Sequence, residues 1–226
     1  SAGVIALARE HAHRSLLGNH EFRLLNYRRT GDPTHLKKSD YDTLKQLSAK
    51  DWAYLSAMSL TYHLPEMSTV LVHAGFLPGA PWRSQPARVV TRIQVVGPDG
   101  EPHKRVDFPD QPHWSERWAG PPFVIYGHTP RRDPAVAKTS LGIDTSCVQG
   151  GALTACVLPG RTLVQVPERD VAPAVERVDA DLGRAADDRG SERPLRPGRL
   201  APAGGEQVPD EHAGPRPAVL VRGDQR

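Results

Sequence analysis

Apolar residues recur at helical spacing in two segments of the chain, and a capping pattern marks the start of a third helix. Over residues 2–13 the apolar positions follow one another every three or four residues, which predicts an amphipathic helix. Residues 20–29, His-Glu-Phe-Arg-Leu-Leu-Asn-Tyr-Arg-Arg, turn helical directly after a short apolar run. Ser48 and Asp51 have the spacing of a capping box, so we expect a third helix to begin there.

Short apolar runs bounded by glycine, proline and polar residues predict strands between and after these helices. The predicted strands lie at residues 15–18, 60–65, 68–75, 121–130 and 140–146, and two more share residues 151–166 with a turn at Pro159-Gly160. Residues 88–96 and 102–108 flank the turn sequence Gly-Pro-Asp-Gly-Glu, which predicts a β-hairpin. Strands mixed with helices indicate an α/β fold.

The composition changes at Pro167. From there onward the chain has no Phe, Trp, Tyr or Lys, and Pro and Gly supply 15 of the last 60 residues. Such a segment cannot bury enough apolar area to offset the entropy of ordering. We therefore expect a folded domain over residues 1–166 and a Pro/Gly/Arg-rich tail over 167–226, disordered from residue 174.

The excess of basic over acidic residues lies in the predicted domain. Residues 1–166 carry 19 Lys and Arg against 14 Asp and Glu, whereas the last 60 residues carry ten against 12. A basic domain favours polyanionic partners such as phosphorylated small molecules, although this charge is also ordinary for a protein surface. The arginines of the tail alternate with acids instead of clustering, and this pattern does not favour a nucleic-acid-binding arm.

The cysteine content and the hydropathy of the chain indicate in which cellular compartment to expect the protein. Two cysteines give no disulfide framework. No apolar run approaches the roughly 18 residues of a membrane span, and the first residues lack the features of a signal peptide. We expect a cytoplasmic protein with no membrane partner.

Three predicted strand ends each present a histidine beside a glycine. They read Leu-Leu-Gly-Asn-His-Glu, Val-Leu-Val-His-Ala-Gly and Val-Ile-Tyr-Gly-His-Thr-Pro. Loops at the carboxyl edge of a buried sheet converge on one crevice, and α/β folds place their chemistry there. A lone histidine at a strand end is more often structural, but three in this order favour a shared site.

The residue types in these loops suit a divalent cation. Imidazoles and an amide oxygen are complementary metal ligands, so we expect Asn19, His73 and His128 to form one side of a metal site. His20 would point into the same crevice and could protonate a leaving oxygen. Glu21 could hold His20 in the required tautomer. The other seven histidines lack this context and are interpreted as surface or packing residues.

Gly-Asn-His-Glu, then His-Ala-Gly, then Gly-His, in that order, resemble the later motifs of the calcineurin-like metallophosphoesterases. The stretches GNHEFRLL, LVHAGFLPG, VIYGHTP and GIDTSCVQGGALTACVLPG are similar to the branch of the phosphoprotein-phosphatase superfamily that holds diadenosine tetraphosphatases and ApaH-like proteins. The resemblance covers residues 1–166. It implies an α/β/β/α sandwich and a two-metal site (Mn, Zn, Fe or Mg), with Asn19, His73 and His128 as ligands of the second metal and His20 as the catalytic acid.

Two earlier motifs of that family, G-D-x-H-G and G-D-x-x-D-R-G, have no match in this sequence. They supply the ligands of the first metal and the bridging carboxylate. The resemblance therefore implies an N-terminally truncated chain whose sandwich lacks its first strands. We expect at most one bound ion and impaired catalysis. The alternative is a non-catalytic remnant that acts as a binding or regulatory module.

For the complete protein the resemblance implies metal-dependent hydrolysis of phosphoesters or phosphoanhydrides. It permits dinucleoside polyphosphates, inorganic polyphosphate, capped RNA ends and phosphoprotein; other nucleic acids are not expected. The candidate phosphate-binding cations are Arg23, Arg28, Arg29 and Arg92, each weighed against a solvated surface charge. The tryptophans of the insert 79–122 could roof the crevice, although a packing role suits Trp114 and Trp118 better.

Overall fold

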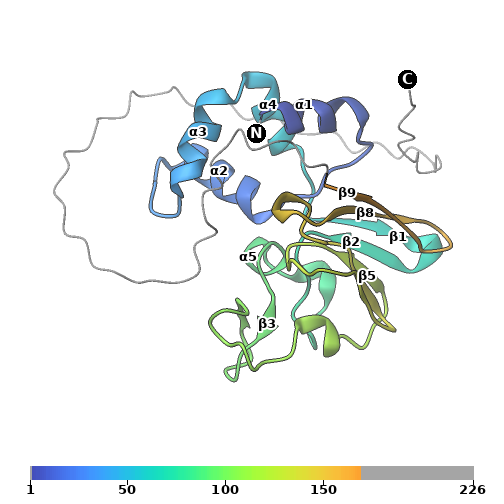
Figure 1. The fold of residues 1–226 in the computed structure, drawn as a ribbon. Coiled ribbons are helices and arrows are strands. Elements are labelled where there is room, and N and C mark those ends of the chain that lie inside the picture. Colours follow the sequence, from blue (N-terminus) through green and yellow to red (C-terminus); the bar gives the residue numbers. More distant parts are fainter. Residues whose placement is uncertain (1, 169–226) are drawn as a thin grey trace, which may run out of the picture. The chain divides into compact units, whose positions relative to one another are not determined.

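A computed structural model describes residues 2–168, and these form a mixed α/β domain (Figure 1). The α-helices are α1 (Ala2–His11), α2 (Asn19–Thr30), α3 (Lys38–Gln46), α4 (Ala49–Ser56) and α5 (Ala87–Val90). The strands are β1 (Thr61–Leu64), β2 (Thr69–Val72), β3 (Val95–Val96), β4 (Pro102–His103), β5 (Phe123–Tyr126), β6 (Ala135–Val136), β7 (Ser140–Gly142), β8 (Ala152–Val157) and β9 (Thr162–Pro167).

A five-stranded mixed sheet lies at the centre of the domain, in the order β1-β2-β5-β7-β6. The inner strands run parallel, with Val72 opposite Tyr126 in β2–β5 and Tyr126 opposite Gly142 in β5–β7, while both edge strands run antiparallel. Parallel neighbours end at one edge of the sheet. The loops that follow β2 and β5 therefore begin side by side.

The main core fills the space between one face of this sheet and the insert that follows β2. Alternate strand residues point to this face because side chains alternate along a strand, and they meet the aromatic side chains of the insert. Trp114 is completely buried, and its indole N–H donates to the carbonyl of Ala74 (3.0 Å). The cluster comprises Val70, Val72, Ala74, Phe76, Val89, Val90, Ile93, Val96, Trp114, Trp118, Val124 and Tyr126.

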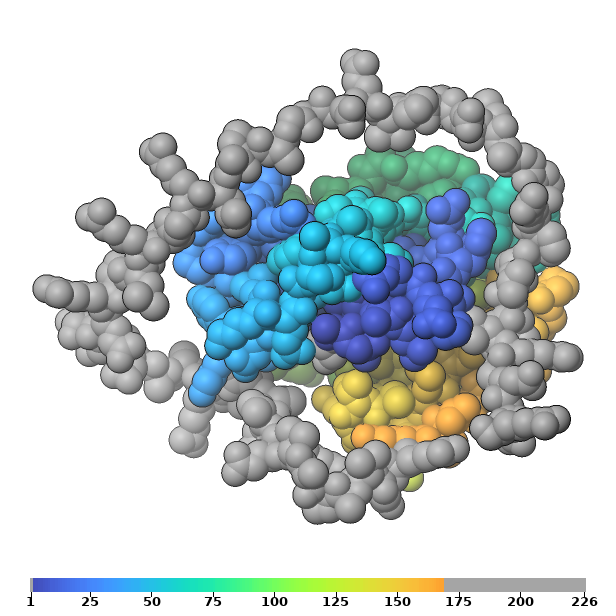
Figure 2. Space-filling model, turned by 90° about the horizontal axis from the view of Figure 1, so that it is seen from above, coloured from blue at the N-terminus to red at the C-terminus, as the bar shows by residue number. Residues whose placement is uncertain are grey.

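The helix α4 contacts both α1 and α2. Arg9 of α1 donates to Asp51 at the start of α4 (2.6 Å), and the guanidinium of Arg28 in α2 stacks over Trp52 of α4 at 4.7 Å. Figure 2 shows the surface formed by these helices and α3 in blue and cyan. The ion pair and the stacked pair join helices whose buried apolar surface is small.

The hairpin of β8 and β9 forms a separate two-stranded sheet. Cross-strand partners share a face, and one such face carries Leu153, Val164 and Val166, which are 65%, 50% and 56% exposed. The opposite face includes buried Thr154. Within the described residues, the solvent-facing side of this hairpin is thus its more apolar side.

The α/β class and most predicted elements are confirmed. Two local predictions are wrong. Residues 15–18 form no strand, only an isolated bridge between Leu16 and Ser59, since the run is too short to make a ladder. Residues 88–96 begin with the helical turn α5 instead of a strand, because Pro86 starts a helix, and the hairpin shrinks to two residues a side in β3 and β4.

The helix α3 and the strand β6 have no counterpart in the sequence prediction. The helix α3 exposes most of its residues and lacks an apolar stripe to announce it. The expected disorder of residues 174–226 lies outside the described residues. No helix within residues 2–168 is long and apolar enough to cross a membrane.

Replacing Trp114 by alanine should lower the free energy of unfolding by about 3–5 kcal/mol, because it empties the centre of the core. Trp82→Ala is the control, since Trp82 is only partly buried at the rim of the same cluster. Urea unfolding followed by circular dichroism measures both. Equal losses in the two variants would contradict the assignment of Trp114 to the core.

Candidate metal and general-acid site

Three loops meet at the carboxyl edge of the central sheet. Asn19 is the first residue of α2, His73 follows β2 directly, and His128 comes two residues after β5. Since β2 and β5 are parallel neighbours, His73 and His128 leave the sheet together. The strand register, which only folding creates, brings together residues that are more than 50 positions apart.

The side chains of these three residues converge on one point. His73 Nε2 lies 3.0 Å from Asn19 Oδ1 and 3.2 Å from His128 Nδ1. The two imidazole rings are tilted by 54° with centroids 4.9 Å apart. The three residues predicted as ligands thus lie next to one another in the fold.

The backbone around His128 selects its tautomer. His128 Nε2 donates to the carbonyl of Arg92 (3.2 Å), which leaves Nδ1 as an acceptor facing His73. The residue adopts a left-handed backbone (φ 66°), which is uncommon for residues other than glycine. An unusual conformation at this position aims the ring into the crevice.

Gly18 allows the loop before α2 to approach His73. A Cβ added at Gly18 would lie 2.6 Å from Glu21 Oε2 and 2.9 Å from His73 Cε1. Both distances are shorter than any Cβ contact tolerates. Close approach of the backbone is therefore the physical reason for glycine at this position.

Both histidines are held neutral. Burial, and then the neighbouring His128, lower the pKa of His73 to about 3. Burial also lowers the pKa of His128, although its bond to Arg92 and the charge of Asp144 act in the opposite direction. Neutral imidazole is the form that ligates metals.

The donor set fits one divalent cation. Donor atoms about 2.0–2.2 Å from a common ion lie roughly 2.8–3.6 Å from each other, and the distances of 3.0 and 3.2 Å fall in this range. Asn19 Oδ1 and His128 Nδ1 both act as acceptors, so in the metal-free protein neutral His73 would carry its proton on Nε2, and a bound cation would take the place of that proton. No cluster of three or more His, Cys, Asp or Glu side chains suited to a metal occurs in the described part of the chain.

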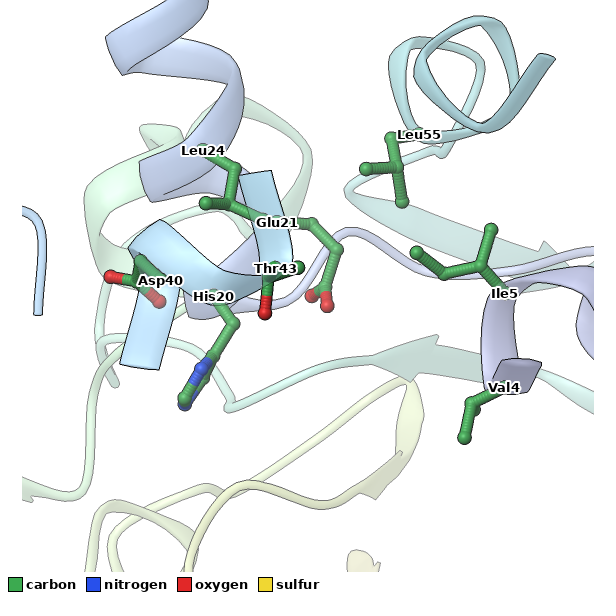
Figure 3. Close-up of a pocket in the computed structure, with 8 residues that line it drawn as sticks. All are labelled: Val4, Ile5, His20, Glu21, Leu24, Asp40, Thr43 and Leu55. Carbon is green, nitrogen blue, oxygen red and sulfur yellow. The ribbon is translucent and has the colours of Figure 1, made fainter. Parts of the chain in front are cut away.

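His20 lies next to these ligands, but it makes no hydrogen bond with Glu21. The charge of His20 acts on the pKa of both His73 and His128, so the three rings are near neighbours. In Figure 3 the side chains of His20 and Glu21 leave α2 in different directions. The structure gives Glu21 no hydrogen bond to His20; the contact that was expected of Glu21 is made by Arg23, whose Nη2 lies 3.3 Å from His20 Nδ1.

Arg23 is a buried residue paired with Asp40 of α3. Its Nε and Nη2 donate to the two carboxylate oxygens of Asp40 at 2.6 and 2.8 Å. Burial opposes ionisation of Asp40, but the hydrogen bonds from Arg23 and from the Lys37 backbone outweigh it and hold the pKa of Asp40 below its usual value. Only Nη1 of Arg23 remains for a phosphate. Sequence reasoning missed Asp40 because it missed α3.

The other predicted phosphate-binding arginines lie at different distances from the site. Arg92 is half-buried, its carbonyl binds His128, and burial and the charge of Arg23 lower its pKa. It is therefore part of the site. Arg28 stacks on Trp52, and Arg29 is exposed and donates to Asn26. The structure does not bring these two to the ligands.

A pocket of about 230 Å³ adjoins His20 (Figure 3). One wall is polar, with His20, Glu21, Asp40 and Thr43, and the other is apolar. The apolar wall consists of Val4, Ile5, Leu24 and Leu55. Asp40, the partner of Arg23, therefore lines the same pocket as His20.

His113, expected to be a surface or packing residue, anchors a buried polar network behind His128. Its Nδ1 bonds the hydroxyl of Ser115 (2.8 Å), its Nε2 bonds that of Thr129 (3.2 Å), and its ring stacks on Tyr126. Burial, with the charges of Arg131 and Arg105, lowers its pKa to about 3. The sequence carries no signal for this network, since its members become neighbours only in the fold.

Several curated proteins are similar to this chain, although no protein-family model matches it. Proteins named bis(5'-nucleosyl)-tetraphosphatase PrpE [asymmetrical] match from Geobacillus thermodenitrificans (43% identity over 72 residues), Halalkalibacterium halodurans (36% over 115) and Bacillus velezensis (28% over 191). These matches cover 32%, 48% and 76% of this chain. The chain spans 26% and 44% of the first two relatives and 72% of the third.

A solved structure described as that of a candidate diadenosine tetraphosphatase has the same fold. It superposes with a TM-score of 0.64 at 27% sequence identity and covers 74% of each chain.

Acidification should weaken the fold through His113. Its folded pKa is about 3 against an ordinary 6.5, so its contribution to stability is complete above pH 6.5 and falls as the pH drops toward 3. Between pH 7 and pH 4 the melting temperature of His113→Gln should fall less than that of the wild type. The difference should be about 2–4 °C for each kcal/mol of pH-dependent stability that the substitution removes. His13→Gln, a change at an exposed position, should keep the wild-type loss. A wild-type loss in His113→Gln would contradict the neutral state of His113.

Proposed function

We propose that this chain, which belongs to the calcineurin-like metallophosphoesterases in their diadenosine tetraphosphatase branch, hydrolyses phosphoanhydride bonds of dinucleoside polyphosphates with a divalent cation. The names of the similar proteins support this substrate class. Inorganic polyphosphate shares the same bond and is the next candidate. Capped RNA ends and phosphoprotein follow, since nothing in the site selects a base or a peptide.

The observation that carries the proposal is that His73 Nε2 lies 3.0 Å from Asn19 Oδ1 and 3.2 Å from His128 Nδ1, with His20 beside them. A structural histidine pair would need no third donor from another loop and no imidazole at its side. Neutral imidazoles can offer a nitrogen lone pair to a metal ion. They are suited to binding a cation.

In this scheme Asn19 Oδ1, His73 Nε2 and His128 Nδ1 hold the cation. A bound divalent cation supplies Lewis-acid stabilisation of the charge on the phosphoryl oxygens and lowers the pKa of water. All three donors are neutral, and two close dications need carboxylate ligands. The described residues therefore support one ion at this position.

The proton and the remaining charge are handled by the chain itself. His20 lies at the mouth of the crevice and is solvent-exposed, so it can reach a leaving oxygen and donate its proton. The half-buried guanidinium of Arg92 adds positive charge next to the ligands. Arg92 would orient the phosphate, and His20 would assist departure of the leaving group.

A second candidate function is a module that binds a polyphosphate without hydrolysing it. The neutral donor set favours this reading, because catalysis in two-metal phosphoesterases depends on a clamp on both the attacking and the leaving oxygen. A binding module needs only the cation and the arginine. The two functions share the metal site and differ in turnover.

Metal binding tests the site directly. Isothermal titration with Mn²⁺ or Zn²⁺ should show one site per chain, and His73→Asn should weaken it by at least tenfold, because one of three donors is displaced. His63→Asn is the control, since His63 packs on Trp82 outside the site. If His63→Asn and His73→Asn bound the ion alike, the proposed ligands would be wrong.

Activity separates the two functions. Hydrolysis of diadenosine tetraphosphate in the presence of Mn²⁺, followed by chromatography of the products, should be measurable for the wild type and fall by about 10²–10⁴-fold in His20→Ala. The binding module predicts a metal site with no turnover above that of His20→Ala. Arg92→Met should mainly raise KM if the guanidinium holds the phosphate.

A further inference from the structure

The ion pair of Asp40 and Arg23 has an unusual position for a structural salt bridge. Both residues are nearly inaccessible, at 4% and 6% exposure, although both carry charge. The guanidinium binds both carboxylate oxygens in a fork, and Asp40 Oδ2 also accepts from the backbone N–H of Lys37 (2.7 Å). The carboxylate is therefore fixed from two sides, and it fixes Arg23 in turn.

The fixed guanidinium makes one further contact, and it falls on His20. Arg23 Nη2 lies 3.3 Å from His20 Nδ1. A guanidinium has only donors, so the imidazole nitrogen in this contact must be the acceptor. In neutral His20 the ring proton is then on Nε2. The hydrogen bond to one nitrogen decides which nitrogen carries the proton.

We propose that Asp40 and Arg23 are positioning residues that hold His20 as the tautomer with its proton on Nε2. Asp40 orients Arg23, and Arg23 occupies Nδ1. The Nε2–H then stands at the outer end of the ring. That this N–H donates a hydrogen bond to the leaving oxygen, and so stabilises the negative charge that develops there, rests on the proposed function; the tautomer itself does not.

The topology explains why a carboxylate on α3 is required. Figure 3 shows Asp40 and Thr43 of α3 beside the start of α2, with His20 projecting beyond them. The side chain of Arg23 lies one turn after His20 on α2, and its guanidinium would have to leave the protein interior if Asp40 were absent, because a buried charge without a partner is strongly unfavourable. Loss of Asp40 should therefore release His20 Nδ1 as well.

A purely structural role for the pair is the competing explanation, and the chain offers a matched control for it. Asp51 stands at the third residue of α4, as Asp40 does in α3; its carboxylate caps that helix and receives Arg9 at 2.6 Å. No histidine touches the pair of Arg9 and Asp51 among the described contacts. Asp51→Asn thus removes the same kind of cap and ion pair away from His20.

The first test needs no substitution in the pair. Long-range ¹H–¹⁵N correlation spectra of the metal-free chain, with the His20 signals identified by their loss in His20→Gln, report which ring nitrogen carries the proton at a pH where the ring is neutral. We expect a single Nε2–H tautomer. A spectrum of the Nδ1–H tautomer, or of a rapid mixture of both, would overturn the proposal.

The second test removes the pair. Arg23→Met, which keeps the length of the side chain but has no donor, and Asp40→Asn should both convert His20 to a mixture of tautomers, whereas Asp51→Asn should leave its spectrum unchanged. If Arg23→Met does not fold, Asp40→Asn and the wild-type spectrum still decide. A pure Nε2–H tautomer in both folded variants would show that the pair does not position His20.

Kinetics then separate this inference from the proposed function. In an active chain, Asp40→Asn should lower kcat with little change in KM, and the loss should be larger for a substrate with a poor leaving group than for p-nitrophenyl phosphate, whose leaving group needs no proton. If the wild type has no activity, the proposed function fails, while the spectra still test the tautomer.

Discussion

The parallel pairing of β2 with β5 is the constraint on which the site depends. It places the ends of two strands side by side at one edge of the sheet. His73 follows its strand without a spacer, and His128 follows after Gly127 in a left-handed conformation. A change of register by one residue would turn either ring away from the other. The rigidity of the sheet is thus what holds two neutral imidazoles within hydrogen-bonding distance.

The class of the fold and the meeting of the three loops could be predicted from the sequence. Each loop follows an apolar run, and a glycine beside it indicates that the backbone comes close to other atoms. Gly18 illustrates this: the sequence shows a glycine, and the structure shows the atoms of His73 and Glu21 that exclude a side chain there. Residues 88–96 were misread because a run rich in valine fits a strand as well as a buried helical turn. Propensity alone does not separate the two.

Asp40, Arg23 and His113 could not be assigned from the sequence for a different reason. Each owes its role to partners that are distant along the chain or that lie on an element without an apolar stripe, and charge alone says nothing about burial. Arg23 was expected to meet phosphate and instead meets a carboxylate. Glu21 was expected to orient His20, but Arg23 of the same helix makes that contact instead. Polar networks of this kind are visible only once the elements are packed.

The hairpin of β8 and β9 has a consequence for how the protein behaves in bulk solution. It turns leucine and valine side chains outward while a threonine is buried beneath it. Apolar faces of this kind are where folded molecules first adhere to one another, and sulfate or phosphate salts strengthen such adhesion. Such salts would then increase the association of molecules through this hairpin.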